Sequence, residues 1–399
     1  MELIIISKHT FFVNSNQNIF STGSSIEDFL QTRKIDYICI KHPINNVSSS
    51  LGEDFVANRK KYSVKTYPSS LAEYFLNGKL IKKVIPYQNS SLLLLKTWQE
   101  FFVTFKLIKR QGRIIDLFIG IDPLNALYGL ILKKIGKVKK VFFYTADYAI
   151  KRFNNPIINW TYHAIDKLAI YHSDQVWNVS TRITTLRKQQ GVPDNKNFFV
   201  PNSPPFKKEK ILNIKNINIH EIVTVGITSS SINFDLLLRV LFTLKNKYPD
   251  IVLKIIGGFE WQDNFKVKIQ TLNLQKNIKF IGKLNHNDFL KELSKSAVGL
   301  AFYTNEIPWT YFCDSMKIRD FLSCGLPVIT NNIHSIADDI KKFNAGYIIN
   351  FNEKKLINVI DKIFKNKTDF LKLRDKGLTM AKKYDIEEIL NSRLSAYLI

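Results

Sequence analysis

Residues 314–330, DSMKIRDFLSCGLPVIT, combine charged side chains with a spacing that suits an anionic, hydroxyl-bearing ligand. Asp314, Lys317 and Asp320 recur at every third position, so on a helix they fall on one side of about two turns. The start of such a helix presents free N–H groups and a positive dipole end to a nearby anion. A cation in the first turn can then contact a phosphate, and an acidic residue further along the helix can accept hydrogen bonds from sugar hydroxyls. The alternative is an ordinary solvated helix face.

This segment resembles the nucleotide-sugar site of GT-B glycosyltransferases, especially the retaining family 4-like group. Asp320, Gly325, Pro327 and Val328 stand where that group has an acid followed by Gly-x-Pro-Val. Most of the family has another acid eight positions before the Asp320 equivalent, but this chain has Phe312 there. It matches instead the sub-pattern Asp-x-x-Lys-x-x-acid, which leaves open the residue that meets the donor sugar ring.

The resemblance implies a role for each charged residue of the segment. Asp320 would accept hydrogen bonds from the ribose hydroxyls of the nucleotide, since a carboxylate offers two acceptor oxygens to a diol. Lys317 would neutralise the diphosphate leaving group, whose charge grows in the transition state. Asp314 would cap its helix, contact the sugar, or do both. Residues 227–235 lack the Arg and Lys with which many family members bind the diphosphate, so this task falls to Lys317 and the dipole of its helix.

Length and pattern predict two domains. At 399 residues the chain exceeds the size at which one hydrophobic core keeps growing, and its 45% apolar share excludes general disorder. Strand-like and helix-like runs alternate in both halves, which indicates parallel sheets with helices on both faces. Together with the resemblance, this predicts an α/β fold of GT-B architecture, with two doubly wound Rossmann-like domains facing each other across a cleft.

A change of composition predicts the domain boundaries. The Pro-rich run PNSPP is followed by a Lys-rich, low-complexity stretch, so we interpret residues 204–220 as a linker. Residues 1–203 would then form an N-terminal Rossmann-like acceptor-binding domain, and residues 221–375 a C-terminal Rossmann-like nucleotide-sugar-binding domain. By the resemblance, a helix within residues 376–399 crosses back to the first domain.

Further donor-binding candidates lie at expected strand ends, because ligands of open α/β sheets bind beyond the carboxyl ends of the strands. Gly226, Thr228 and Ser229 follow one strand, and their backbone and hydroxyl groups could hold phosphate oxygens. Gly257 closes the next strand and would allow a nucleobase or ribose close to the backbone. An ordinary polar loop or turn explains each of them equally well.

Two acids are candidate catalytic residues. Asp147 follows an expected strand, at a point where family enzymes often place a His or an acid against the transferred sugar or the acceptor. Glu306 lies in the loop after another strand and could reach the donor. Arg182 is a candidate for an acceptor or phosphate contact. His9 and His42 each end an expected strand, but a lone histidine is more often a satisfied scaffold residue.

The charge of the chain is unevenly distributed. The formal net charge is +24, and residues 1–215 hold 32 Lys/Arg against 15 Asp/Glu, a difference of +17. Residues 216–399 hold 26 against 19, a difference of +7. A basic first half suits an anionic partner: membrane headgroups, a pyrophosphate-linked lipid or nucleic acid. With the aromatic and basic stretch 92–110, it predicts a cytoplasmic protein in peripheral contact with the inner face of the plasma membrane.

The sequence indicates neither a membrane span nor a metal site. No stretch approaches the ~18 apolar residues of a spanning helix, and the first residues lack the features of a signal peptide. No His, Cys, Asp or Glu group has metal-ligand spacing, and P-loop, GxGxxG and Asp-x-Asp patterns do not occur. Three distant cysteines fit a reducing compartment. We therefore expect no metal and no cofactor, the nucleotide-sugar being the donor substrate.

The sequence thus predicts a metal-independent glycosyltransferase, retaining by resemblance. It would move a sugar from a nucleotide-diphosphate sugar to a hydroxyl of a glycan or lipid-linked acceptor in polysaccharide biosynthesis. One alternative is a basic nucleic-acid-binding protein without catalysis, although no nucleic-acid motif is present and the aromatics lie mostly in apolar strands. Another is a sugar-nucleotide epimerase with the same fold.

Overall fold

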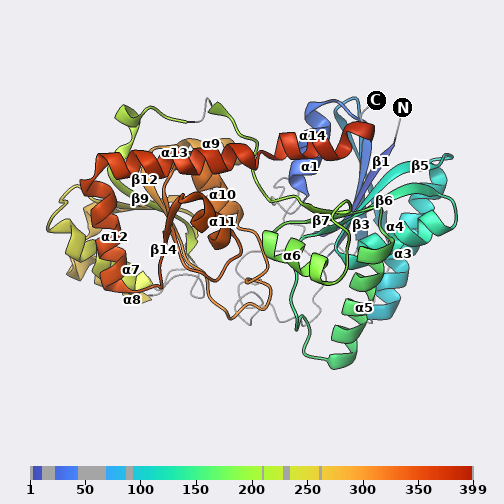
Figure 1. Ribbon diagram of the computed structural model, residues 1–399, viewed down its shortest axis with the longest axis horizontal. Helices are drawn as coiled ribbons and strands as arrows, with labels where there is room; N and C mark the ends of the chain where they lie inside the picture. Colours follow the sequence, from blue (N-terminus) through green and yellow to red (C-terminus); the bar gives the residue numbers. More distant parts are fainter. Residues whose placement is uncertain are drawn as a thin grey trace. The chain divides into compact units, whose positions relative to one another are not determined.

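The structure is a computed structural model that describes residues 3–10, 23–43, 69–86, 93–208, 211–227, 234–259 and 263–397. The chain forms two compact units, each with its own sheet and helices (Figure 1). Unit 1 comprises Met1–Asn202, Ile307–Cys313 and Glu387–Ile399, and unit 2 comprises Ser203–Glu306 and Asp314–Ile386. Residues 204–220, expected as a linker, therefore lie in unit 2, as do residues 376–386.

Unit 1 is built on an eight-stranded sheet in the order β4-β3-β2-β1-β5-β6-β7-β8. Its strands are β1 (Ile4–Thr10), β2 (Tyr37–Pro43), β3 (Ser69–Leu76), β4 (Lys79–Pro86), β5 (Ile115–Ile121), β6 (Val138–Thr145), β7 (Gln175–Asn178) and β8 (Asn197–Phe199). Its helices are α1 (Ser24–Thr32), α3 (Leu93–Arg110), α4 (Pro123–Lys134), α5 (Pro156–His172), α6 (Thr181–Gln189) and α14 (Ile386–Leu394), the last beginning at the boundary with unit 2.

One edge of this sheet departs from the expected parallel arrangement. Strand β3 pairs antiparallel with both β2 and β4, whereas the other strand pairs of unit 1 are parallel. The β3–β4 connection is Asn77-Gly78, and both residues have positive φ, 49° and 75°. This dipeptide favours a two-residue hairpin turn, because both of its residues tolerate the left-handed region. The sequence therefore contained a hairpin signal at this dipeptide, which the prediction of parallel sheets from alternating strand-like and helix-like runs did not include.

Helices α3, α4 and α5 cover one face of the sheet of unit 1. Val141 of β6 packs with apolar residues of α3 and α4, and Phe143, two positions on, packs with residues of α4 and α5. Residues two apart on a strand point to the same face, so the three helices lie on one side. They follow one another beside the sheet in Figure 1, with α4 in contact with both neighbours.

The start of α1 departs from the usual capping pattern. Serine is a common N-cap residue, but the N-cap position is Gly23, which precedes Ser24 and Ser25, and no side chain caps the helix. Gly23 has φ 87°, and a Cβ there would lie 2.2 Å from Cδ1 of Ile121. Glycine is therefore favoured by the backbone conformation, and a larger residue would also displace the end of the Ile121 side chain.

Unit 2 is built on a six-stranded parallel sheet in the order β11-β10-β9-β12-β13-β14. Its strands are β9 (Asn218–Ile227), β10 (Val252–Phe259), β11 (Ile278–Gly282), β12 (Ser296–Ala301), β13 (Val328–Thr330) and β14 (Gly346–Ile348). Its helices are α7 (Phe234–Lys245), α8 (Asp263–Thr271), α9 (His286–Ser294), α10 (Met316–Ser323), α11 (Ile336–Phe343), α12 (Glu353–Lys365) and α13 (Lys367–Lys383).

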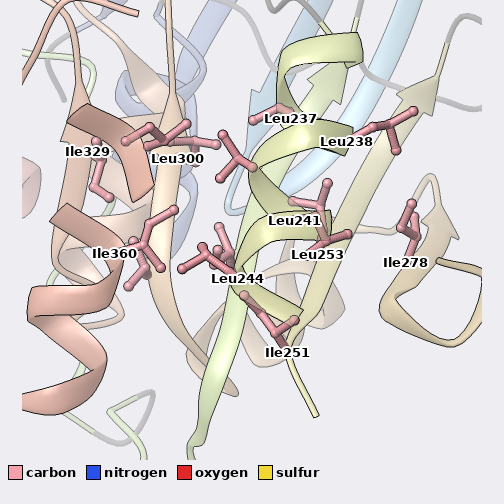
Figure 2. Packing of buried hydrophobic residues seen from close by; sticks show 14 of the residues in the cluster. Leu237, Leu238, Leu241, Leu244, Ile251, Leu253, Ile278, Leu300, Ile329 and Ile360 are labelled. Atoms are coloured by element: carbon pink, nitrogen blue, oxygen red, sulfur yellow. The ribbon is translucent and has the colours of Figure 1, made fainter. Parts of the chain in front are cut away.

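The core of unit 2 shows why these segments fold as they do. Leu237, Leu241 and Leu244 recur at helical spacing on α7, so they share one side of the helix and are buried. They pack with Leu253 of β10 and with apolar residues of β11, β12, β13 and α12 (Figure 2). Burial of a leucine side chain contributes about 2 kcal/mol, so this helix is stabilised mainly by its packing on the sheet.

The turn between α10 and β13 explains the glycine of the Gly-x-Pro pattern. Gly325 has φ 76°, and a Cβ there would lie 2.8 Å from Nη1 of Arg374. That guanidinium donates to the carbonyl oxygen of Gly325 at 2.9 Å and to that of Leu212 at 2.8 Å. The turn thus brings α10 against α13, and Arg374 connects it to the backbone of Leu212.

Candidate functional site

Two glycines meet at the carboxyl edge of the sheet of unit 2. Gly226, near the end of β9, has φ 59°, and Gly257, in β10, has φ 96°. A Cβ on Gly257 would lie 3.6 Å from the backbone nitrogen of Gly226. Neither glycine has a side chain, so a ligand can approach the backbone closely at these two positions.

The amine of Lys317 lies beside this pair of glycines. Its Nζ is 3.7 Å from the position that a Cβ on Gly226 would occupy. The side chain is half-buried, and this burial lowers the pKa of Lys317. Within the described ranges no carboxylate forms an ion pair with this ammonium, and no hydrogen bond from it is found. The site therefore contains a partly desolvated cation to which the described protein offers no counter-charge.

The helix that carries Lys317 begins next to it. Ser315 is the N-cap of α10, and its Oγ accepts from the backbone nitrogen of Ile318 at 3.2 Å. The hydroxyl of Tyr303 makes a further hydrogen bond with this Oγ. The capping role considered for Asp314 is therefore wrong, because the serine that follows it performs this role. Lys317 is the second residue of α10, where the helix dipole adds to its positive charge.

Asp314 forms a buried ion pair instead. Its Oδ2 lies 3.0 Å from Nε of Arg319 and its Oδ1 lies 3.0 Å from Nη2 of the same guanidinium. Arg319 also donates to Oδ2 of Asp339 at 3.2 Å, and its guanidinium lies over the ring of Tyr384. This arrangement anchors the start of α10 to α11. A role of Asp314 in donor binding stays a prediction, and the structure shows its carboxylate engaged with Arg319.

The remaining donor-side candidates differ in exposure. Asp320 lies one turn after Lys317 on α10 and is buried. Glu306 is exposed, in the loop after β12. Thr228 and Ser229 lie outside the described residues. The structure thus brings Gly226, Gly257 and Lys317 together, with Asp320 on the same helix.

The candidates of unit 1 both contact neighbouring side chains or backbone. Asp147, just after β6, accepts from Arg152 at 2.5 Å and 3.3 Å. Burial alone would lower the pKa of Arg152, but Asp147 holds it raised. Arg182 donates to the backbone oxygen of Tyr311 at 3.0 Å and lies over its ring. The catalytic role of Asp147 and the acceptor contact of Arg182 stay predictions.

A charged cluster in unit 1 was not expected. His9, at the end of β1, lies 2.6 Å from Oδ2 of Asp122 and 3.0 Å from Oε2 of Glu100. Burial alone would lower the pKa of His9, but the two carboxylates raise it to about 10. Burial would raise the pKa of Glu100, but His9 holds it at about 2. His9 is therefore an imidazolium at neutral pH.

The second histidine of this region behaves oppositely. His42 is fully buried, between the hydroxyls of Ser70 at 2.8 Å and Thr104 at 3.2 Å. Burial lowers its pKa to about 4, so it is neutral at pH 7. The scaffold interpretation fits His42, because its ring nitrogens have nearby hydroxyl partners. The scaffold interpretation does not explain the positive charge of His9.

Two general properties complete the description of the sites. Over the described ranges, no group of three or more His, Cys, Asp and Glu side chains is arranged to hold a metal ion. Among the helices that the structure describes, none combines the length and the apolar character needed to cross a bilayer.

The fold defines the chain as an α/β protein of the GT-B class. A crystal structure of Alr3699/HepE from Anabaena in complex with UDP matches with a TM-score of 0.66 and 13% identity, over 100% of this chain and 99% of its own. Sucrose-phosphate synthase from Thermosynechococcus elongatus matches with a TM-score of 0.64 and 12% identity, over 99% and 98%. The expected α/β fold class with two Rossmann-like domains is confirmed.

A family model matches part of the chain. Residues 206–383 are similar to the model of the glycosyl transferases group 1, in agreement with the resemblance found in the sequence.

Two curated proteins are related to the chain over part of its length. An uncharacterized glycosyltransferase of Haemophilus influenzae is 25% identical over 225 residues, 56% of this chain and 61% of its own length. A chitobiosyldiphosphodolichol beta-mannosyltransferase of Debaryomyces hansenii is 25% identical over 173 residues, 40% and 34% of the two chains. The matched region thus spans less than two thirds of either relative.

Proposed function

We propose that the edge of unit 2 formed by Gly226, Gly257, Lys317 and Asp320 binds a nucleotide-diphosphate sugar, and that the protein transfers this sugar to a hydroxyl acceptor. The observation that carries the proposal is the half-buried amine of Lys317, which lies against a strand-end glycine and has no counter-charge among the described residues. A diphosphate would supply the missing negative charge.

The chemistry of sugar transfer explains why a cation belongs at this point. As the bond between the sugar and the diphosphate breaks, negative charge grows on the leaving oxygen. A fixed ammonium at a helix N-terminus stabilises that charge more strongly than it stabilises the bound donor, and therefore lowers the barrier. Asp320 would accept from the ribose hydroxyls, and the two glycines would let the nucleotide lie against the backbone.

The other residues of the proposal complete the reaction. Asp147 and Glu306 would contact the reacting sugar, Arg182 would contact the acceptor, and Thr228 and Ser229 would contact the diphosphate. We infer from the family resemblance that the reaction retains the anomeric configuration and needs no metal ion.

Relatives support the donor and acceptor classes. HepE was solved with UDP and with UDP-glucose, which supports a uridine diphosphate sugar as donor. The name of the Debaryomyces relative supports a glycan or lipid-linked acceptor. We propose a cytoplasmic location, which fits a nucleotide-sugar substrate.

A panel of UDP-, GDP- and ADP-sugars tests the proposal with the purified protein. One nucleotide is expected to raise the thermal midpoint, since a ligand of the native state stabilises it by mass action. Release of the free nucleotide, with and without octyl glycosides as hydroxyl acceptors, measures turnover. Unchanged turnover in both Lys317→Ala and Asp320→Ala variants would refute the site assignment, and absence of any nucleotide effect would refute the function.

A further inference from the structure

Large apolar side chains are exposed along the helices of unit 1. On α3 the exposed fractions are 51% for Leu95, 56% for Trp98 and 59% for Phe102. On α5 they are 73% for Ile157 and 71% for Trp160. Single exposed apolar residues are ordinary, but two tryptophans with a phenylalanine and aliphatic neighbours indicate a surface that is covered in the working protein.

These side chains belong to one face of unit 1. Leu95, Trp98 and Phe102 recur at spacings of three and four, so they form one stripe along α3. Helix α4 lies between α3 and α5 over the same face of the sheet (Figure 1). It adds the exposed Ile131. We call the outer surface of these three helices the α3–α5 face.

The charges of the α3–α5 face have one sign. The acids within the three helices are Glu100 and Asp166, and both are buried. Glu100 lies beside His9, and Asp166 forms a buried pair with Arg187. The exposed charged residues of the three helices are therefore all cations: Lys106, Lys109, Arg110, Lys134 and Lys167.

The combination points to a lipid surface. We infer that the α3–α5 face docks on an anionic bilayer, with its tryptophans at headgroup depth and its lysines against the lipid phosphates. Tryptophan suits this depth because its ring is apolar and its N–H can bond to water or headgroups. Lysine is depleted in the cores of protein interfaces but is attracted to anionic lipid. Charge complementarity therefore favours lipid over a second protein.

The biological role of this docking rests on the proposed function, because the bilayer would place the transferase beside a lipid-linked acceptor. The docking itself is independent of catalysis. A protein that binds vesicles but no nucleotide would contradict the proposed function alone, and a protein that binds nucleotide but no vesicles would contradict this inference alone.

Vesicle flotation tests the inference with the full chain. The probes are vesicles of phosphatidylcholine alone and vesicles in which about one third of the lipid is phosphatidylglycerol, at about 0.1 M and about 1 M salt. We expect binding to the anionic vesicles that weakens at high salt. Trp98→Ser/Phe102→Ser and Ile157→Ser/Trp160→Ser should each lower the partition coefficient about tenfold or more.

Two further variants make the test specific. Lys106→Gln/Lys109→Gln should lower binding to anionic vesicles by about fivefold per residue and leave the weaker binding to neutral vesicles unchanged. The matched control is Phe242→Ser/Val267→Ser, which removes two exposed apolar side chains from unit 2, with exposed fractions of 44% and 59%, and should bind vesicles like the wild type. The thermal midpoint of each variant verifies its fold.

Three results would overturn the inference. One is a wild-type protein that fails to float with anionic vesicles at low salt. Another is flotation of both apolar variants at the wild-type level. The third is a wild-type dimer that ignores vesicles and dissociates in the Trp98→Ser/Phe102→Ser variant, which would assign the α3–α5 face to a second copy of the chain.

Discussion

Replacement of Lys317 by methionine should have opposite effects on nucleotide binding and on the stability of the free protein. Methionine keeps an apolar side chain of similar length but removes the ammonium. Two unit charges 4 Å apart interact by about 4 kcal/mol at an effective dielectric constant of 20. Because solvent and the helix dipole remain, the loss of nucleotide-binding free energy should be closer to that of one charged hydrogen bond, about 1.5–3 kcal/mol. Nucleotide affinity should therefore fall roughly 10- to 150-fold.

The free protein should not be destabilised by Lys317→Met. Burial disfavours the charge of Lys317, and no described carboxylate compensates for it. Without nucleotide, the free energy of unfolding should be unchanged or higher. This sign distinguishes a ligand-binding lysine from a structural one, because a structural lysine is held by a partner in the protein.

Lys254 provides the matched control. Its Nζ lies 2.5 Å from Oε1 of Glu221, and both side chains are 3% exposed. Lys254→Met leaves that carboxylate buried without its main partner, which should cost about 3–5 kcal/mol of stability while nucleotide affinity is unchanged. Urea unfolding and calorimetric titration with UDP, GDP and ADP measure both quantities. The reasoning is refuted if Lys317→Met binds the preferred nucleotide as tightly as the wild type, or if it is destabilised as strongly as Lys254→Met.

Three other predictions concern single side chains. Asp320→Asn should weaken UDP binding about tenfold and leave the affinity for 2′,3′-dideoxy-UDP unchanged, because the lost charge acts on the ribose hydroxyls; an equal loss for both ligands, measured by calorimetry, would contradict this role. Arg319→Ala should cost about 3–5 kcal/mol in urea unfolding, since it leaves the buried Asp314 and Asp339 without their cation, and Arg319→Lys should recover part of this loss. His9→Gln should change the pH dependence of stability: the folded pKa of His9 is raised from 6.5 to about 10, so its stabilising contribution is fully present below pH 6.5 and is lost as pH rises through about 10. Urea unfolding should therefore show that the wild type loses stability relative to His9→Gln as pH rises from 6.5 to about 10. If the free energies of unfolding of the two proteins changed with pH in parallel, the carboxylates would not hold the proton on His9.

Local patterns explain what the sequence could predict. The leucines of α7 recur at helical spacing, and Gly325 precedes Pro327 at a turn into a strand, so the element type is encoded within a few residues. The order of such elements predicts two α/β units. The Asn77-Gly78 turn was equally local, and its hairpin could have been predicted from the dipeptide alone.

Distant contacts explain what the sequence could not predict. Arg319 reaches Asp339 across 20 positions, and His9 reaches Asp122 and Glu100 across 113 and 91 positions. Nothing in the neighbourhood of these residues distinguishes them from solvated charges. The tertiary fold brings these opposite charges together. It places Asp339 of α11 within reach of Arg319, and it places Glu100 of α3 and Asp122 beside His9 of β1.

The two cations of α10 support the assignment of the site more strongly than either does alone. Lys317 and Arg319 are two positions apart, which places them about 200° apart around the helix. On one side the protein supplies Asp314 and Asp339 to a buried guanidinium. On the other it supplies two glycines, and no described carboxylate forms an ion pair with the half-buried ammonium. A structural explanation accounts for the paired arginine, since burial of a charge is offset by its partners. It does not account for the lysine, whose desolvation is offset when an anionic ligand occupies the edge of the sheet.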